Sequence, residues 1–150
     1  MGIAGENVVI VEGDAVGFAQ QITAGIHELS ADESVAVGGT QTGPDPYQLL
    51  LAALGACTSM TVAMYARRKQ WPLARVRVQL AHSKIWAQDC AECATTEARL
   101  DRIDRVISLE GNLTPDQCQR LIEIANKCPV HKTLTSEVSI VTRLAESTRV

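Results

Sequence analysis

The sequence predicts an α+β fold in which antiparallel strands pack on one long apolar helix. Three observations predict it. Residues 46–66 form an uncharged, mostly apolar segment; short alternating patterns typical of strands lie on both sides of it; and no strand–helix unit repeats as it would in a parallel sheet. The length of 150 residues suits a single domain covering residues 1–150, or one subunit of a compact oligomer.

Composition excludes several classes of function. The net charge of -3 leaves no basic surplus for binding phosphates, and an aromatic content of 3% provides few side chains for stacking on bases, so no nucleic-acid partner is expected. Five cysteines, an odd number, point to reduced thiols. No secretory pattern precedes the first strand pattern, so we expect a cytoplasmic protein.

The segment before the helix predicts strands and one long loop. Residues 7–11 and 18–26 are expected to form a hairpin, and residues 29–37 a third, short strand. The glycines and prolines of residues 38–46 then exclude regular structure. This loop either belongs to a site or only leads into the helix.

The helix predicted over residues 46–66 has no polar face. Such a helix is enclosed by protein or by lipid, and Arg67, Arg68 and Lys69 follow it as a positive flank would follow a membrane span. Two observations disfavour a membrane span. The segment contains polar residues, and the strands elsewhere in the chain have apolar faces that need a partner. We therefore expect the helix to be a protein core, with no membrane partner.

The segment after the helix predicts a long hairpin. Residues 75–80 alternate strictly, and the pattern loses its phase near Ile85 and Trp86, which indicates a bulge or an exposed extension. Residues 100–109 form the second strand. Its inward positions are Ile103, Ile107 and Leu109, and its charged residues, expected in solvent, are Asp101, Arg102, Asp104 and Arg105.

A second helix is predicted to start at Thr114, as N-cap, with Pro115 in its first turn and Gln117 closing a capping box. Its expected apolar stripe consists of Cys118, Leu121, Ile122 and Ala125. The pair Cys128-Pro129 ends this helix and starts a short turn over residues 129–134. A last strand is expected over residues 137–144.

Two cysteines are candidates for chemistry. A thiol within an apolar helix, such as Cys57, is inert unless a cation or hydrogen-bond donors stabilise its thiolate, so a structural role and a nucleophilic role both stay open. Cys128 is predicted at a helix start, with Lys127, His131 and Lys132 nearby, which favours thiolate. It is either a redox thiol or the mark of a helix break.

The residues 43–60, GPDPYQLLLAALGACTSM, together with 128–132, CPVHK, resemble the OsmC/Ohr superfamily of osmotically inducible and organic-hydroperoxide-resistance proteins, in particular its YhfA-like branch. The resemblance implies an intertwined homodimer whose antiparallel sheets wrap around long central helices. It implies that Cys57 attacks a hydroperoxide, forms a sulfenic acid and condenses with Cys128. A dithiol then reduces that disulfide, and no cofactor is needed.

The sequence departs from the peroxidase pattern at Tyr47. Peroxidases of the family carry a glutamate there, which holds an arginine that ionises the thiol. Arg67 lies ten residues after Cys57, roughly 15 Å along a helix, and cannot reach it within one subunit. His131, or Arg67 and Arg68 of the partner subunit, are candidate replacements. The competing hypothesis is a non-catalytic, stress-associated dimer that binds a small hydrophobic ligand.

A further pair, Cys90 and Cys93, lies in the loop between the two long strands. A Cys-x-x-Cys pair forms half of a zinc site or a redox pair. With His82 as third ligand, Cys118 or Asp89 would be a poor fourth, and a second subunit could also complete the site. Zinc is thus a weak alternative and no metal is expected; an accessory redox pair and no chemistry are the other interpretations.

Overall fold

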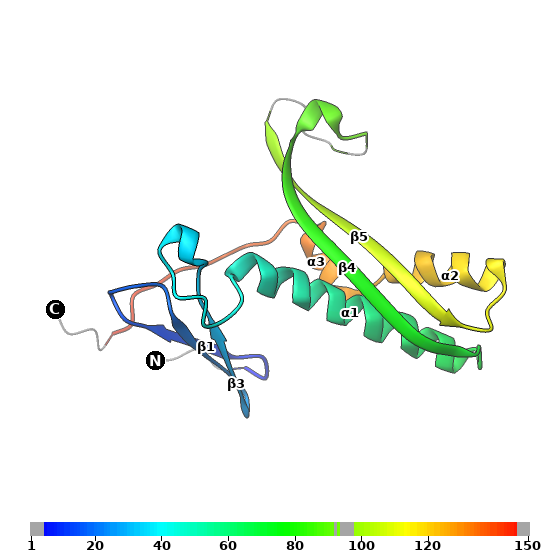
Figure 1. The fold of residues 1–150 in the computed structure, drawn as a ribbon, viewed down its shortest axis with the longest axis horizontal. Coiled ribbons are helices and arrows are strands. Elements are labelled where there is room, and N and C mark those ends of the chain that lie inside the picture. Colours follow the sequence, from blue (N-terminus) through cyan, green and yellow to red (C-terminus); the bar gives the residue numbers. More distant parts are fainter. Residues whose placement is uncertain (1–4, 92, 94–97, 147–150) are drawn as a thin grey trace. The chain divides into compact units, whose positions relative to one another are not determined.

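The computed structural model describes residues 5–91, 93 and 98–146. The chain divides into two compact units, Met1–Leu49 with Ser139–Val150, and Leu50–Val138. The order of elements is strands, long helix, long hairpin and two shorter helices (Figure 1). The predicted α+β class with antiparallel sheets and one long helix is confirmed.

The first unit contains a three-stranded antiparallel sheet of β1 (Val9–Gly13), β2 (Gln20–Ala24) and β3 (His27–Ala31). The predicted hairpin is present, but the third strand begins earlier than expected. Gly25 adopts a φ of 63° in the two-residue turn after β2, so Ala24 pairs directly with His27. Val35–Val37, expected in the third strand, forms the short 3-10 helix η1 instead.

The loop after β3 is folded around one carboxylate. Asp32 is 2% exposed, and its oxygens accept hydrogen bonds from the backbone N–H groups of Glu33, Thr40 and Thr42 at 2.7–3.2 Å. The hydroxyls of Thr40 and Thr42 donate two more, at 2.6 and 2.8 Å. These hydrogen bonds, led by that of the Thr40 hydroxyl, hold the pKa of Asp32 far below its ordinary range. The loop therefore has an internal anchor that orders the chain before the long helix.

Helix α1 (Pro46–Arg68) begins where the sequence predicted it. The backbone N–H of Gln48 donates to Asp45 Oδ1 at 2.8 Å, and the Asp45 N–H donates to Gln48 Oε1 at 2.9 Å, which is a reciprocal cap. The helix is long and apolar enough to cross a membrane by length and composition. One of its faces is nevertheless buried in protein, through Leu54, Gly55, Thr58, Val62 and Ala66.

The second unit packs this face of α1 beneath a hairpin and a helix. Strands β4 (Leu73–Trp86) and β5 (Arg99–Gly111) form a long antiparallel ribbon, which extends beyond the helices at its tip (Figure 1). Their pairing continues to Trp86 opposite Arg99, so the loss of phase reflects an exposed extension, and the only register shift lies between Leu73 and Arg75. A side chain on Gly55 would meet Leu80 Cδ1 at 2.9 Å, so α1 approaches β4 closely.

The core joins α1 to helix α2 (Pro115–Ala125), whose predicted capping box at Thr114 is present. Val62 and Ala66 pack against Leu121 and Ala125, all of them buried. The inward face of α2 also includes Ile124, whereas Ile122, expected in the stripe, is exposed. Helix α3 (Pro129–Leu134) follows the break at Cys128 as predicted.

The last predicted strand is wrong for this chain. Residues 137–146 form no helix or strand, although they are described throughout. The alternation of Val138 and Ile140 indicates a strand, but both side chains are exposed, and neither sheet among the described residues includes this segment.

Candidate functional site

The fold brings together the two cysteines that the sequence singled out. Cys57 lies in the middle of α1 and is half-buried, whereas Cys128 is the N-cap of α3 and is 0% exposed. The Cys57 thiol lies within hydrogen-bonding reach of the Cys128 sulfur, where it favours the thiolate of Cys128. Two thiols far apart in the sequence are thus neighbours in the fold.

The surroundings of Cys128 favour its charged form. Burial raises the pKa of this thiol, but four other contributions outweigh it and lower the pKa below its ordinary value. The backbone N–H of His131 donates to Cys128 Sγ at 3.3 Å, and the Thr58 hydroxyl lies 3.8 Å from it. The Cys57 thiol, by a hydrogen bond, and Arg105, by its positive charge, also lower the pKa of Cys128. The site therefore stabilises the thiolate of Cys128.

Arg105 on β5 is the cation of the site, and the expectation that it lies in solvent is wrong. Its guanidinium donates to Thr58 Oγ1 at 2.9 Å and to Asn126 Oδ1 at 2.8 Å, and lies 3.2 Å from His131 Nδ1. The signal was present in the sequence: Arg105 shares the parity of Ile103 and Ile107, which face inward. A charge on the inward face of a strand indicates a site.

His131 is an acceptor in this arrangement. Burial and the neighbouring Arg105 lower the pKa of its imidazole, so the ring is neutral at pH 7. The neutral tautomer with its proton on Nε2 leaves Nδ1 free to accept from Arg105. Within one subunit the positive charge beside the cysteines therefore comes from Arg105, and His131 helps to hold it in place.

A pocket of about 390 Å³ opens beside these residues. Arg105, Asn126 and His131 provide its polar side, and apolar side chains provide the rest. The full lining is Leu54, Asp101, Ile103, Arg105, Asn126, His131, Leu134 and Thr135. A lining of this mixed kind suits a small organic molecule that carries one polar group.

Tyr47 and Arg67 lie far from the cysteines along α1. Tyr47 is in the first turn and half-exposed, and Arg67 is in the last turn. Each is ten residues from Cys57, roughly 15 Å along the helix at about 1.5 Å per residue. The structure does not bring either of them to the paired thiols of the same subunit.

Cys90 and Cys93 are joined to each other in a disulfide, with 5.5 Å between their Cα atoms. His82, the third ligand considered for zinc, lies 2.7 Å from Asp101 Oδ1, and Lys84 lies 3.4 Å from the same oxygen. Among the described residues no group of three His, Cys, Asp or Glu side chains could hold a metal ion.

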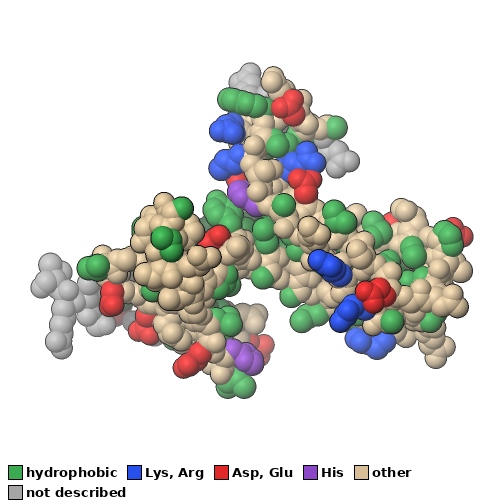
Figure 2. Space-filling view, in the orientation of Figure 1, with side chains coloured by type: hydrophobic (Ala, Val, Ile, Leu, Met, Phe, Trp, Pro, Cys, Tyr) green, Lys and Arg blue, Asp and Glu red, His purple; other side chains and the backbone are tan. Residues whose placement is uncertain are grey.

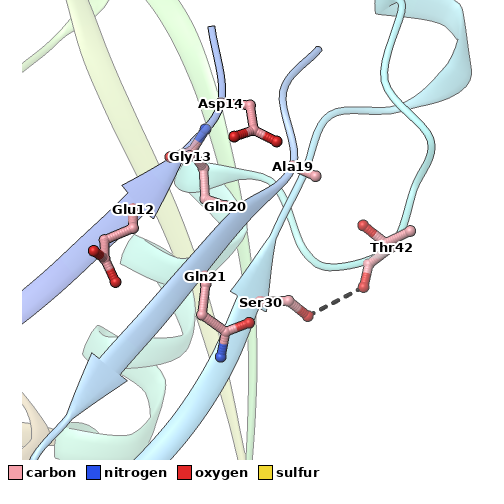
Figure 3. A pocket seen from close by; sticks show the side chains of 8 residues that line it. All are labelled: Glu12, Gly13, Asp14, Ala19, Gln20, Gln21, Ser30 and Thr42. Carbon is pink, nitrogen blue, oxygen red and sulfur yellow. Dashed lines mark hydrogen bonds between the residues drawn. The ribbon is translucent and has the colours of Figure 1, made fainter. Parts of the chain in front are cut away.

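A second hollow, of about 550 Å³, lies in the first unit beside the β1–β2 loop (Figure 3). Its lining residues are Glu12, Gly13, Asp14, Ala19, Gln20, Gln21, Ser30 and Thr42. The Ser30 hydroxyl donates to the Thr42 carbonyl oxygen at 3.2 Å. This lining contains neither a thiol nor an imidazole, so the paired cysteines remain the candidate site.

The fold and the site together define an α+β protein with two adjacent thiols on the helical side of an antiparallel ribbon. The model of the OsmC-like protein family matches residues 39–143, and the chain belongs to this family. Proteins of this family are soluble, so α1 is a core helix rather than a membrane span.

Solved structures share the fold at low sequence identity. An OsmC-like protein from Mycoplasma pneumoniae has a TM-score of 0.68 and 15% identity, over 88% of this chain and 89% of that chain. A putative osmotic stress induced and detoxification response protein from Psychrobacter arcticus has a TM-score of 0.67 and 17% identity, over 89% and 91%. The organic hydroperoxide resistance protein OhrB of Bacillus subtilis has a TM-score of 0.59 and 21% identity, over 86% and 90%. No curated protein matches significantly.

Proposed function

We propose that this protein is a cytoplasmic thiol-dependent peroxidase, with peroxiredoxin-like chemistry, that reduces small organic hydroperoxides as a homodimer. The observation that carries the proposal is the contact between Cys57 and Cys128 beside the Arg105 guanidinium. A peroxidatic thiol needs stabilisation of negative charge and a second thiol close by, and this site supplies both. The name of the Bacillus subtilis neighbour, an organic hydroperoxide resistance protein, supports the choice of substrate class.

The partly exposed thiol makes the first attack. Cys57 is reachable, whereas Cys128 has no exposed surface. The Cys57 sulfur attacks the terminal peroxide oxygen and the O–O bond breaks. The sulfur keeps that oxygen as a sulfenic acid, and the alkoxide leaves and takes a proton to become an alcohol.

The second step closes a disulfide. The Cys128 thiolate attacks the sulfenic sulfur of Cys57, the S–O bond breaks, and hydroxide leaves and is protonated to water. The stabilised charge on Cys128 suits this attacking role. An external dithiol then reduces the disulfide and restores both thiols.

Arg105 is proposed to activate the pair. The two thiols share a hydrogen bond, so they hold one negative charge as a unit. The guanidinium keeps that charge favourable, and its hydrogen bond to Thr58, the residue after Cys57, fixes its position. Arg105 therefore takes the place of the arginine that the family's glutamate holds, since that glutamate is Tyr47 here and Arg67 does not reach the thiols of its own subunit.

The competing function is a non-catalytic dimer that binds a small hydrophobic ligand in the 390 Å³ pocket. Stopped-flow consumption of tert-butyl hydroperoxide separates the two functions. The wild type is expected to consume peroxide rapidly, and Cys57→Ser is expected to abolish turnover. Cys118→Ser is the matched control, because Cys118 is a free thiol on α2 that is not among the groups acting on Cys128. Equal slow rates for all three proteins would support the binding protein.

The dimer is proposed because the second face of α1 is apolar and bare. Leu50, Met60 and Met64 are exposed on it, and Met60 is 71% exposed. Apolar side chains are also exposed on β1 and in residues 138–144, and the face seen in Figure 2 carries many separate hydrophobic side chains. A soluble monomer rarely exposes this much apolar surface, and a second copy of the chain would cover it.

A further inference from the structure

We infer that Cys90 and Cys93 form a second redox centre, separate from Cys57 and Cys128, that exchanges electrons with external dithiols at the tip of the β4–β5 ribbon. The two cysteines are bonded to each other in the loop that follows β4. The pair contains neither Cys57 nor Cys128 and its chemistry does not require them, although Asp101 lines the pockets beside both pairs.

The Cys90–Cys93 disulfide contributes little to the stability of the fold. It encloses only two residues, and short loops gain the least from cross-linking. The ribbon itself already closes the tip, because Trp86 pairs with Arg99 and the Ala87 N–H donates to the Ala98 carbonyl oxygen at 2.9 Å. The pair can therefore be reduced without opening the hairpin.

The pair also borders a pocket. A hollow of about 400 Å³ is lined by both cysteines together with Ile85, Leu100, Asp101 and Arg102. A small dithiol or the active-site loop of a protein reductant needs such access to reach a disulfide sulfur. Cys128, with no exposed surface, offers no comparable access to a protein.

The end of β4, close to the pair in the sequence, offers a surface that a protein partner could recognise. Trp86 ends β4, is 56% exposed, and has the Arg99 guanidinium 5.4 Å from its ring centroid. An exposed tryptophan with a stacked arginine is the kind of group that anchors a protein partner. Around the ribbon tip, Figure 2 shows hydrophobic side chains together with charges of both signs.

The exchange is an ordinary two-electron reaction. A thiolate of the external dithiol attacks one sulfur of the Cys90–Cys93 bond, which gives a mixed disulfide and one free thiolate. The second thiol of the donor then attacks the mixed disulfide. The donor leaves as a disulfide, and Cys90 and Cys93 keep two electrons and two protons.

The test uses the full chain with Cys57→Ser, Cys118→Ser and Cys128→Ser, so that the pair is the only dithiol and hydroperoxide turnover is absent whatever the proposed function. The protein is equilibrated with reduced dithiol, trapped with a maleimide and mapped by mass. We expect the disulfide fraction to fall by about tenfold or more, and to recover when oxidised dithiol is added. Dihydrolipoamide and a thioredoxin are used in separate arms, to identify a small or a protein donor.

Two results would overturn the inference. One is a pair that stays oxidised in both arms, or that stays reduced when oxidised dithiol is added. The other is a fall in melting temperature of more than about 3 °C on reduction, which would make the disulfide structural. The same chain with Cys90→Ser and Cys93→Ser added is the control, and must show no change in trapped thiol.

Discussion

The Arg105 guanidinium on β5 donates a hydrogen bond of 2.9 Å to the hydroxyl of Thr58 on α1, the residue that follows Cys57. Helix α1 carries no charged residue before its last turn, so it has no ionic group of its own near the thiols. The ribbon supplies that group from outside the helix. The electrostatic field at the paired cysteines therefore depends on the packing of β5 against α1.

Replacing Arg105 by Met is expected to slow hydroperoxide consumption at pH 7 by up to about tenfold, because the loss of its positive charge raises the pKa of Cys128 and each pKa unit costs a factor of ten in thiolate. Arg105→Lys is expected to recover only part of the rate, since lysine lacks the planar fork that reaches Thr58 and Asn126 together. The measurements are stopped-flow rates and the ultraviolet absorbance of thiolate against pH. Arg77→Met, an exposed arginine on β4, is the control; equal effects of the two Met variants would contradict this role.

The stability of the reduced protein is expected to rise with pH from the lowered pKa of Cys128 in the folded protein up to about pH 9. The pKa of Cys128 is lowered in the folded protein from its ordinary value of 9.0. The unfolded chain then binds more protons over the interval between the two values, so the free energy of unfolding increases with pH there and is lost as pH falls through the folded pKa. Urea denaturation of the reduced wild type at several pH values measures how the free energy of unfolding changes with pH. Cys128→Ser should flatten this dependence, and a slope unchanged by that substitution would contradict it.

We expect a separate change in the free energy of unfolding at acid pH, caused by His131. Because the pKa of its imidazole is lowered from the ordinary value of 6.5, the unfolded chain takes up a proton at higher pH than the native state. Stability is expected to fall as pH falls below 6.5, where the charged ring would also face Arg105. Denaturation of His131→Gln at pH 5 and pH 7 should give a smaller difference than that of wild type. A larger difference for His131→Gln than for wild type would show that the His131 ring is not held neutral.

Asp32→Asn is expected to lower the melting temperature by roughly 5 °C. The carboxylate accepts five hydrogen bonds from a nearly enclosed position, and an amide can accept only on its single oxygen. Differential scanning calorimetry measures the loss. Asp14→Asn, at an exposed position of the β1–β2 loop, is the control. An Asp32 variant as stable as this control would mean that the loop does not need its anchor.

Met60→Glu is expected to give a monomer in light scattering after size exclusion, whereas the wild type is expected to elute as a dimer. Met60 is the most exposed large apolar side chain of α1, so a charge there would be buried without a partner in the proposed interface. Met60→Leu keeps the apolar surface and serves as the control. A wild type that is monomeric at high concentration would overturn the assembly itself.

Much of the fold could be predicted from local patterns. The start of α1, the capping box at Thr114 and the break at Cys128 each depend on a few neighbouring residues, and each lies where the sequence indicated. The third strand was displaced because the turn at Gly25 needs only two residues. The strand expected over residues 137–144 has the right alternation, but a strand also needs a partner, which a single-chain pattern does not provide.

The candidate site could be predicted only in part. Cys57 stands out because it lies in an apolar helix, and Cys128 because a proline follows it. Arg105, the cation of the site, was expected in solvent together with the charged residues around it. The parity of Arg105 with Ile103 and Ile107 was the available signal. Its contacts with Thr58, Asn126 and His131 are long-range, so the identity of the partners needed the fold.

Helix α1 is apolar on the side that fills its own core and equally apolar on the side that is bare. If two copies share that bare side, each chain completes its hydrophobic interior only by meeting another. Folding and encounter then become one equilibrium, and the temperature at which the protein melts will climb as its solution is made more concentrated.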